Sequence, residues 1–219
     1  MALVESLAGD SKILFKSEER HWQLSDQGAA AVLLKVDEFQ KRLGTKGAFI
    51  NKGSLNESKV LKAKPLPIIK RPNLPFDGHV EILGDQKDQL LNVLKDSRGC
   101  LMLDESEEID NIYVHSLGEQ YTLVSSLCWR AAYNAGNGFW LMDKSLSKVY
   151  KMITDSGESY SEGIIYESHK GRGIGDCWSG KSWAWNGLDF ITAEEYSTGL
   201  CKGMPGGAWV LPTIVSEVE

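Results

Sequence analysis

The part of the chain after Cys100 consists largely of short segments that are typical of β-strands. Tyr121–Cys128 is rich in β-branched and aromatic residues, and similar segments follow it at short intervals, separated by turn residues. Between two of them, Asn186-Gly187 predicts a hairpin, because this dipeptide readily adopts the positive φ angles of a type I′ turn. The later segments are Phe139–Met142, Val149–Ile153, Ile164–His169, Ser182–Trp185, Phe190–Thr192 and Ala208–Leu211.

Two helices are predicted in addition to these strands. Ser25-Asp26 can cap a helix that continues to Leu43, where Gly44 ends it. A second helix begins at Asp85 and ends at Arg98. The predicted class is therefore α+β, a mostly antiparallel β-sheet with two principal helices, stapled by disulfides. Three short strands complete the prediction: Ile13–Phe15, Ala48–Ile50 and His79–Leu83.

The order of these segments divides the chain into four parts. Residues 1–12 are predicted to be a flexible tail, and residues 13–58 form a part with a helix and short strands. Residues 59–78 combine lysines with closely spaced prolines, which favours an extended crossing rather than an element of the core. Residues 79–219 form the β-rich part, and we expect residues 13–219 to make one compact unit.

Composition and charge argue against several classes of protein. The 219 residues carry a formal net charge of -6, whereas a nucleic-acid-binding protein usually has a basic excess, so no nucleic-acid partner is expected. No apolar run approaches the roughly 18 residues that span a bilayer, so no transmembrane segment is expected. The first residues lack the basic start and the apolar stretch of a signal peptide, and we expect such a signal to have been removed.

The four cysteines bear on the compartment in which the chain folds. No Cys-x-x-Cys pair occurs and no histidine lies within five residues of a cysteine, so a structural zinc site is disfavoured and no metal is expected. An even number suits disulfides, and four cysteines allow three pairings. We favour pairing between sequence neighbours, and the alternative is four reduced cysteines in a cytosolic protein. The favoured disulfides are Cys100–Cys128 and Cys177–Cys201.

Four short stretches, in order along the chain, resemble the sequence pattern of one protein family. In the first, Ala30–Gly53, the matching positions are Asp37, Gln40, Arg42, Gly44 and Thr45. The second combines Cys128 with Ala132-Tyr133-Asn134. The third is Lys170–Cys177, with its alternating glycines. The fourth is Cys201-Lys202-Gly203, followed by Trp209 and Pro212-Thr213.

Together these stretches resemble a family of secreted proteins of Gram-negative bacteria known as domain of unknown function 1176. The chain is similar to the C-terminal two-thirds of a typical member. The resemblance implies a periplasmic protein that is exported by a signal peptide and contains disulfides. It implies no activity, since the family has none that can be carried over.

Two interpretations of the glycine-rich stretch remain open. Its backbone N–H groups, uncovered by side chains, can bind an anion together with Lys170 and Arg172. Alternate glycines also occur where another backbone approaches a strand closely. The first interpretation makes Lys170 and Arg172 candidate binding residues, and the second gives the stretch a structural role.

Trp183 and Trp185 are a second candidate binding feature. They alternate along a predicted strand, so both rings lie on the same face. An exposed pair of this kind can stack on sugars or anchor a protein interface. The alternative is that both rings belong to the core of the sheet.

The stretch from Ser156 to Tyr160, followed by Lys170-Gly171, resembles a loop of a family of periplasmic lysozyme inhibitors. In such inhibitors a projecting loop enters the catalytic cleft of the enzyme, and its polar side chains bond the catalytic carboxylates. The alternative is ordinary turn chemistry, in which serine and glycine are common. Ser156 and Tyr160 are therefore candidate binding residues under the first interpretation.

Evidence for catalysis in the sequence is thin. The histidines are scattered, and neither a nucleophile elbow nor a zinc-protease pattern occurs. Asp176 and Glu162 form a candidate carboxylate pair for a hydrolase, although nothing in the sequence sets their separation. The acidic run from Asp104 to Asp110 is typical of a solvated loop. A buried polar network that fixes the first helix is predicted for Asp37, Gln40 and Arg42.

The predicted function is that of a periplasmic binding protein without enzymatic activity. We expect its partner to be another protein or an envelope glycan, and we expect no cofactor. The alternatives are an inhibitor of an envelope-attacking enzyme, either lysozyme-inhibitor-like or immunity-type, and a hydrolase of unknown substrate. The candidate binding residues are Lys170, Arg172, Trp183, Trp185, Tyr160 and Ser156.

Overall fold

The chain forms two compact units, Met1–Pro65 and Leu66–Glu219. This computed structural model describes residues 2–9, 12–74, 78–97, 99–104 and 111–219. The boundary between the units lies in the predicted crossing of residues 59–78, where residues 60–67 contain neither helix nor strand. The division differs from the single compact unit that the sequence predicted for residues 13–219, since the extended crossing separates two sets of contacts.

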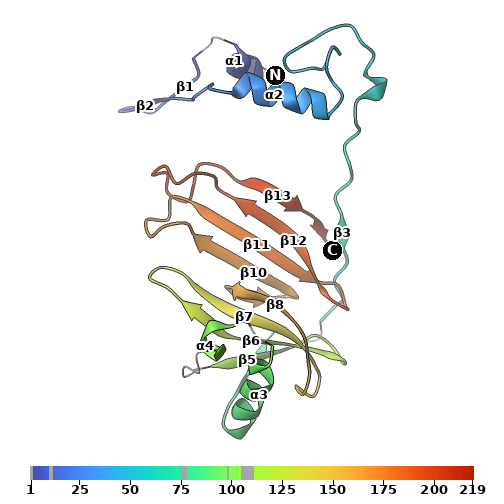
Figure 1. The fold of residues 1–219 in the computed structure, drawn as a ribbon, viewed down its shortest axis with the longest axis vertical. Coiled ribbons are helices and arrows are strands. Elements are labelled where there is room, and N and C mark those ends of the chain that lie inside the picture. The colour runs from blue at the N-terminus through green and yellow to red at the C-terminus, as the bar shows by residue number, and fades with distance from the viewer. Residues whose placement is uncertain (1, 10–11, 75–77, 98, 105–110) are drawn as a thin grey trace. The chain divides into compact units, whose positions relative to one another are not determined.

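The first unit contains two α-helices, a short hairpin and a 3-10 turn (Figure 1). A helix occupies most of residues 1–12, where the sequence predicted a tail. Among the described residues, none of the helices is both long and apolar enough to span a membrane. The elements are α1 (Ala2–Ala8), β1 (Leu14–Lys16), β2 (His21–Gln23), α2 (Ala29–Phe39) and η1 (Glu57–Lys59).

Helix α2 ends earlier than predicted, at Phe39 rather than Leu43. Lys41 adopts a left-handed φ of 58°. Its N–H group donates to the carbonyl of Glu38 at 3.1 Å, and the next N–H group donates to the carbonyl of Asp37 at 2.7 Å. This pair of bonds is the Schellman arrangement, which satisfies the last carbonyls of a helix and stops it. The helix therefore ends before it reaches the glycine that was predicted to stop it.

Two other local predictions for this unit differ from the structure. Gly28, and not Ser25-Asp26, occupies the position before the first residue of α2. Ala48–Ile50 does not form a strand. Two N–H groups of this segment donate to the carboxylate of Asp37 instead of to a neighbouring strand, so the segment is held as a turn against α2.

The second unit is a sandwich of two five-stranded antiparallel sheets (Figure 1). Strands that follow one another in the chain also pair with one another in each sheet. The first sheet contains β4 (His79–Ile82), β5 (Ile112–Ser116), β6 (Tyr121–Arg130), β7 (Ala135–Asp143) and β8 (Val149–Gly157). The second contains β9 (Ser159–Ser161), β10 (Ile164–Lys170), β11 (Trp178–Trp185), β12 (Phe190–Ser197) and β13 (Leu211–Val215).

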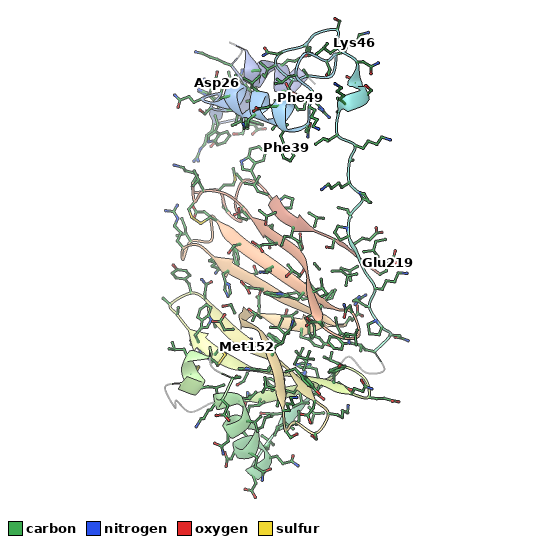
Figure 2. All side chains as sticks on the ribbon, turned by 45° about the vertical axis from the view of Figure 1, so that its right-hand side comes forward. Asp26, Phe39, Lys46, Phe49, Met152 and Glu219 are labelled. Carbon is green, nitrogen blue, oxygen red and sulfur yellow. A yellow bond between two sulfur atoms is a disulfide. The ribbon has the colours of Figure 1, made fainter. Side chains whose placement is uncertain are left out.

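Side chains from the facing surfaces of the two sheets form one hydrophobic core (Figure 2). Leu123 and Phe139 reach it from the first sheet, and Trp183 and Trp185 reach it from the second. The opposite face of the first sheet is covered by α3 (Asp85–Lys95) and α4 (Leu101–Asp104), with Trp140 fully buried beneath them. The predicted α+β class is confirmed, and so is the mostly antiparallel pairing.

Both predicted disulfides are present, Cys100–Cys128 and Cys177–Cys201. The first connects the residue before α4 to β6, under the helical layer of the second unit. The second joins the loop before β11 to the loop after β12. The first bond therefore ties the helical layer to the first sheet, and the second ties together two loops at one end of the second sheet.

The hairpin between β11 and β12 forms where Asn186-Gly187 predicted one, but its turn is displaced by one residue. Gly187 has a positive φ of 98° and occupies the first central position. Asn186 does not adopt a positive φ, and its side-chain oxygen accepts from the N–H groups of Leu188 and Asp189. A small parallel pair was not predicted: β3 (Ile68–Ile69) lies beside β14 (Glu217–Val218).

Candidate functional site

The glycine-rich stretch of residues 170–177 folds as a tight loop between β10 and β11. A side chain at Gly171 would lie 2.6 Å from the sulfur of Cys177, so the disulfide requires glycine at this position. The side-chain amide of Asn134 donates to the carbonyl of Lys170 at 2.9 Å and accepts from its N–H group at 3.1 Å. Asn134 belongs to the second of the four family-like stretches, which therefore meets the third at this loop.

Arg172 and Asp176 form a two-bond ion pair within the loop. Nε of Arg172 donates to Oδ1 of Asp176 at 2.7 Å, and Nη2 donates to the other carboxylate oxygen. The hydrogen bonds from Arg172 hold the pKa of Asp176 well below its usual range, and the N–H group of Gly203 contributes to this. The charge of Arg172 is thereby matched by a buried carboxylate, which supports the structural interpretation of the stretch over an anion cradle.

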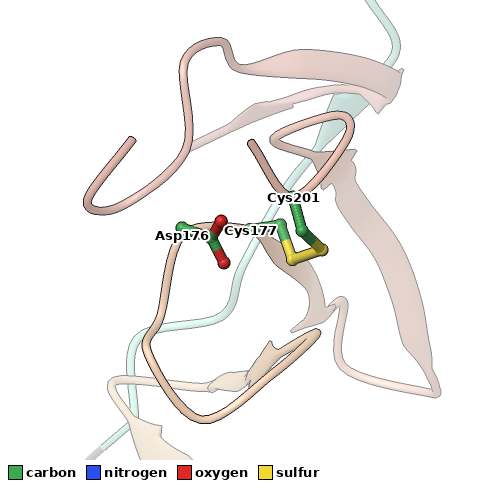
Figure 3. Close-up of side chains that lie close together, drawn as sticks. All are labelled: Asp176, Cys177 and Cys201. Carbon is green, nitrogen blue, oxygen red and sulfur yellow. A yellow bond between two sulfur atoms is a disulfide. The ribbon is translucent and has the colours of Figure 1, made fainter. Parts of the chain in front are cut away.

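Asp176 also lies beside the disulfide of Cys177 and Cys201 (Figure 3). The three side chains are close enough together to resemble a metal site, and they are the one such group among the described residues. A metal would need thiolate sulfurs, whereas both sulfurs are bonded to each other. The arrangement therefore does not suit a metal ion.

Next to this loop, two aromatic rings lie on the outer face of the second sheet. Successive residues of β11 lie on opposite faces of the sheet. Trp178 and Gly180 are therefore on the outer face, while the side chain of Trp183 points into the core. Gly180 pairs with Tyr196 of β12, and a side chain at Gly180 would lie 2.4 Å from the tyrosine ring. The glycine thus lets the ring of Tyr196 lie over the sheet beside Trp178, and both rings stay partly exposed.

These two rings line a hollow of about 770 Å³, which we call the outer groove. Two residues of opposite charge, Lys170 and Glu194, line the groove. The ammonium group of Lys170 lies 5.5 Å from the centroid of the Trp178 ring, and Glu194 is exposed. Ile174 and Val210 are exposed apolar residues at its rim. The groove is lined by Lys170, Ile174, Gly175, Trp178, Glu194, Tyr196, Thr198, Gly206 and Val210.

The predicted binding role of Trp183 and Trp185 does not agree with their position. Both rings are buried, at 8% and 1% exposure, in the core between the two sheets. Trp185 packs against Tyr121 and Phe190, with ring centroids 5.3 and 5.2 Å apart. The core interpretation that the sequence left open therefore describes these rings, since a second sheet covers the face on which they lie.

Ser156 and Tyr160 do not lie on a projecting loop. Ser156 is in β8, where its hydroxyl accepts from the indole N–H of Trp129 at 3.3 Å. Gly157 ends this strand and is buried, and Glu158 leads directly into β9 in the other sheet. The segment is the crossing between the two sheets, so it does not provide the protruding loop of a lysozyme inhibitor. Tyr160 lines a cleft between the sheets.

The predicted polar network around Asp37 is simpler than expected. Its fully buried carboxylate accepts from the N–H groups of Phe49 and Ile50 at 2.8 and 3.0 Å. Arg42 instead places its guanidinium 5.2 Å from the centroid of the Phe49 ring. In the part of the chain that the structure describes, the amide oxygen of Gln40 is buried without a hydrogen bond.

The candidate carboxylate pair of a hydrolase is not brought together. Glu162 precedes β10 and Asp176 follows it, so seven strand residues separate them, which corresponds to about 20 Å. Paired carboxylates of glycosidases lie about 5–9.5 Å apart. The acidic run from Glu105 to Asp110 lies outside the described residues, as does the side chain of Asp104.

The sequence pointed to Lys170 at this site but gave no role to Tyr196. The available signal was weak: Tyr196 is one aromatic residue near the end of a strand, and its partner across the sheet is a glycine. A glycine in a strand interior is a position where another group approaches closely. Which group approaches Gly180 could be seen only once β11 and β12 were in register.

Comparison with known proteins places the chain in one family. No curated protein and no solved structure matches it. The family model described as "Protein of unknown function (DUF1176)" matches residues 1–216. Correspondence to the C-terminal two-thirds of a typical member stays a prediction. Since the match covers nearly the whole chain and agrees with the four stretches that resemble the family, this protein belongs to the DUF1176 family.

Proposed function

We propose that this protein is a binding protein of the bacterial cell envelope without enzymatic activity, and that its outer groove contacts a glycan. The observation that carries the proposal is the pair of partly exposed rings, Trp178 and Tyr196, beside each other in the hollow next to the disulfide-bonded loop. The other candidate aromatic pair, Trp183 and Trp185, lies in the core.

The chemistry of the outer groove suits a sugar chain better than a purely apolar partner. Aromatic rings pack against the C–H faces of pyranose rings, and they combine this apolar contact with polar neighbours. Lys170 and Glu194 supply a donor and an acceptor for sugar hydroxyl or amide groups. The groove is open to solvent rather than enclosed, which suits a polymer that passes through the site.

The periplasmic location is part of the same proposal. Two disulfides join all four cysteines, and disulfides persist in oxidising compartments such as the periplasm. A glycan of the envelope would be within reach of the groove in that compartment. The resemblance of the four sequence stretches to secreted proteins supports the same location.

Co-sedimentation with purified peptidoglycan sacculi tests the proposal. We expect Trp178→Ala and Tyr196→Ala each to lower the association constant by about tenfold, because each removes one stacking ring. A soluble oligomer of N-acetylglucosamine should compete with the sacculi for the wild-type chain. Tyr150→Ala is the matched control, since Tyr150 is a partly exposed ring in β8, outside the groove.

Thermal unfolding of each variant shows whether it is folded, which matters because the indole N–H of Trp178 also donates to the carbonyl of Gly175 at 2.9 Å. Tyr196→Ala does not remove this bond and is the more direct test. Sedimentation of both groove variants at the wild-type level would exclude the groove as the site. Failure of the wild-type chain to sediment would exclude this glycan as the ligand.

A further inference from the structure

A cleft between the two sheets lies apart from the outer groove. Its volume is about 440 Å³, within the usual range of small-molecule sites. Strands β5 and β6 provide its floor, and residues 158–160, where the chain enters β9, line its other side. The cleft reaches from the exposed ring of His79 to the buried side chains of His115 and Ser125. It is therefore a depression with a polar, buried end.

Four rings line this cleft, three from the first sheet and one from the second. The centroid of His79 lies 4.8 Å from that of Tyr113 and 5.7 Å from that of His115. The centroid of His115 lies 4.6 Å from that of Tyr160 on the other sheet. His79 and His115 are directly paired across β4 and β5, so their side chains lie on the same face. The rings form a continuous aromatic wall, and Phe139 adds apolar surface nearby.

The deep end of the wall is held by hydrogen bonds. Nε2 of His115 lies 3.2 Å from the hydroxyl of Ser125, and both side chains are less than a tenth exposed. Asn137 donates to the backbone carbonyl of Glu158 at 3.3 Å, which fixes the side of the cleft where the chain crosses between sheets. The cleft is thus formed by residues with defined positions on both sheets.

Two opposite charges also line the cleft, Arg130 at the end of β6 and Glu158 before β9. Both are exposed residues. Across the described residues, neither side chain takes part in a salt bridge or a side-chain hydrogen bond. A guanidinium can bind a carboxylate, and a carboxylate can bind an ammonium group. The pair is complementary to a ligand that carries both charges.

We propose that the cleft binds a free α-amino acid with an aromatic side chain. The carboxylate of the ligand would pair with Arg130 and its ammonium group with Glu158, while its ring would lie along the wall of His79, Tyr113 and His115. The proposal is independent of glycan binding, because none of these residues lines the outer groove.

Isothermal titration of the full chain with L-phenylalanine and two analogues tests the assignment of each charge. 3-Phenylpropanoate keeps the carboxylate and lacks the ammonium group, and 2-phenylethylamine keeps the ammonium group and lacks the carboxylate. We expect Arg130→Gln to weaken L-phenylalanine and 3-phenylpropanoate by about tenfold and to leave 2-phenylethylamine unchanged. Glu158→Gln should weaken L-phenylalanine and 2-phenylethylamine by a similar factor and leave 3-phenylpropanoate unchanged.

This crossed pattern separates recognition from a general loss of structure, which would weaken all three ligands together. Lys202→Gln and Glu119→Gln are matched controls, since both residues are exposed and outside the cleft, and they should bind like the wild-type chain. Absence of saturable binding of L-phenylalanine at millimolar concentration overturns the proposal. Equal weakening of all three ligands by either variant overturns the assigned pairing.

Discussion

Asp176 accepts hydrogen bonds both from within the glycine-rich loop and from the segment after Cys201. Its carboxylate receives two bonds from Arg172 of the same loop and one from the N–H group of Gly203, which follows the partner cysteine Cys201. It is 2% exposed. A buried carboxylate is tolerated when its charge is paired and its oxygens are hydrogen-bonded. Asp176 therefore joins the two segments that the disulfide also joins.

Acid should weaken this connection, because protonation removes the charge of the Asp176 carboxylate. The stability of Asp176→Asn relative to the wild-type chain should show how much the charge contributes at each pH. The pKa of Asp176 is lowered in the folded chain, so its contribution to stability is present above the unfolded pKa, about 3.9, and is lost as the pH falls through the folded value. We expect Asp176→Asn to be less stable than the wild-type chain at pH 7. The difference should hold down to about pH 5 and shrink below about pH 4.

Urea unfolding at a series of pH values measures this difference. Glu119→Gln is the control, because Glu119 is an exposed residue in the turn between β5 and β6. Its difference from the wild-type chain should be small throughout. The assigned role of the Asp176 charge would be contradicted if the stability difference of Asp176→Asn disappeared between pH 7 and pH 5, or if it did not shrink in acid.

At the scale of single elements, contacts near the C-terminal end of α2 hold the helix, while several of its apolar side chains are exposed. Val32 and Phe39 are exposed at 63% and 77%, whereas Asp37 is the buried residue of the helix. The Asp37 carboxylate fixes the turn that contains Phe49, and its carbonyl accepts the bond that closes the helix end. Lys41 must adopt a left-handed conformation for this end to form.

Lys41→Gly should therefore stabilise the end of α2. A left-handed conformation costs a residue with a side chain about 1–2 kcal/mol, and glycine loses more entropy on folding, which leaves a gain of about 0.5–1 kcal/mol. Hydrogen exchange of the α2 amides should slow accordingly. Lys35→Gly is the matched control in the helix interior, where we expect a loss of about 1 kcal/mol. Faster exchange in Lys41→Gly would refute the assigned role.

Strand β11 shows how one element serves two surfaces. Its odd-numbered tryptophans, Trp183 and Trp185, fill the core between the sheets, while Trp178 lines the outer groove and Gly180 lies beneath the Tyr196 ring. A change of one residue in register would exchange the two sets. The bulge after Ser182 lies between the core residues and the groove residues, and the pairing resumes beyond it.

At the scale of the molecule, the crossing between the two units is exposed along nearly its whole length. Residues 60–67 contain no helix or strand, and nearly all of them are exposed. Proteases cleave such segments first. The second unit has its own hydrophobic core and both disulfides, so it should remain folded after cleavage.

Limited digestion with trypsin measures this prediction. We expect early cleavage after Lys62, because Ala63 follows it, and not after Lys64, because Pro65 follows that residue. The product that begins at Ala63 should persist and keep the two disulfides, as mass spectrometry without reductant would show. Lys62→Gln should delay its appearance. Early cuts within the strands of the second unit would instead argue against its independence.

Local patterns were sufficient for much of the fold. The start of α3 at Asp85 was predicted, and acidic residues occupy its first turn. Both disulfides join cysteines that are neighbours in the sequence, as predicted. The predicted strand Tyr121–Cys128 lies within β6. The end of α2 was missed because a left-handed lysine, which sequence statistics disfavour, stops the helix before the glycine.

The candidate site was predicted less well, because the packing of one sheet on the other decides which of its residues are exposed. The sequence by itself determined that Trp183 and Trp185 share one face of a strand, and that glycines surround Arg172. Only the tertiary structure decided which face of the second sheet meets the first sheet, and therefore which rings are buried. It also decided that Arg172 pairs with Asp176 and that Tyr196 lies over Gly180. Periodicity along a strand defines two faces, but what covers each of them depends on strands that lie far away in the sequence.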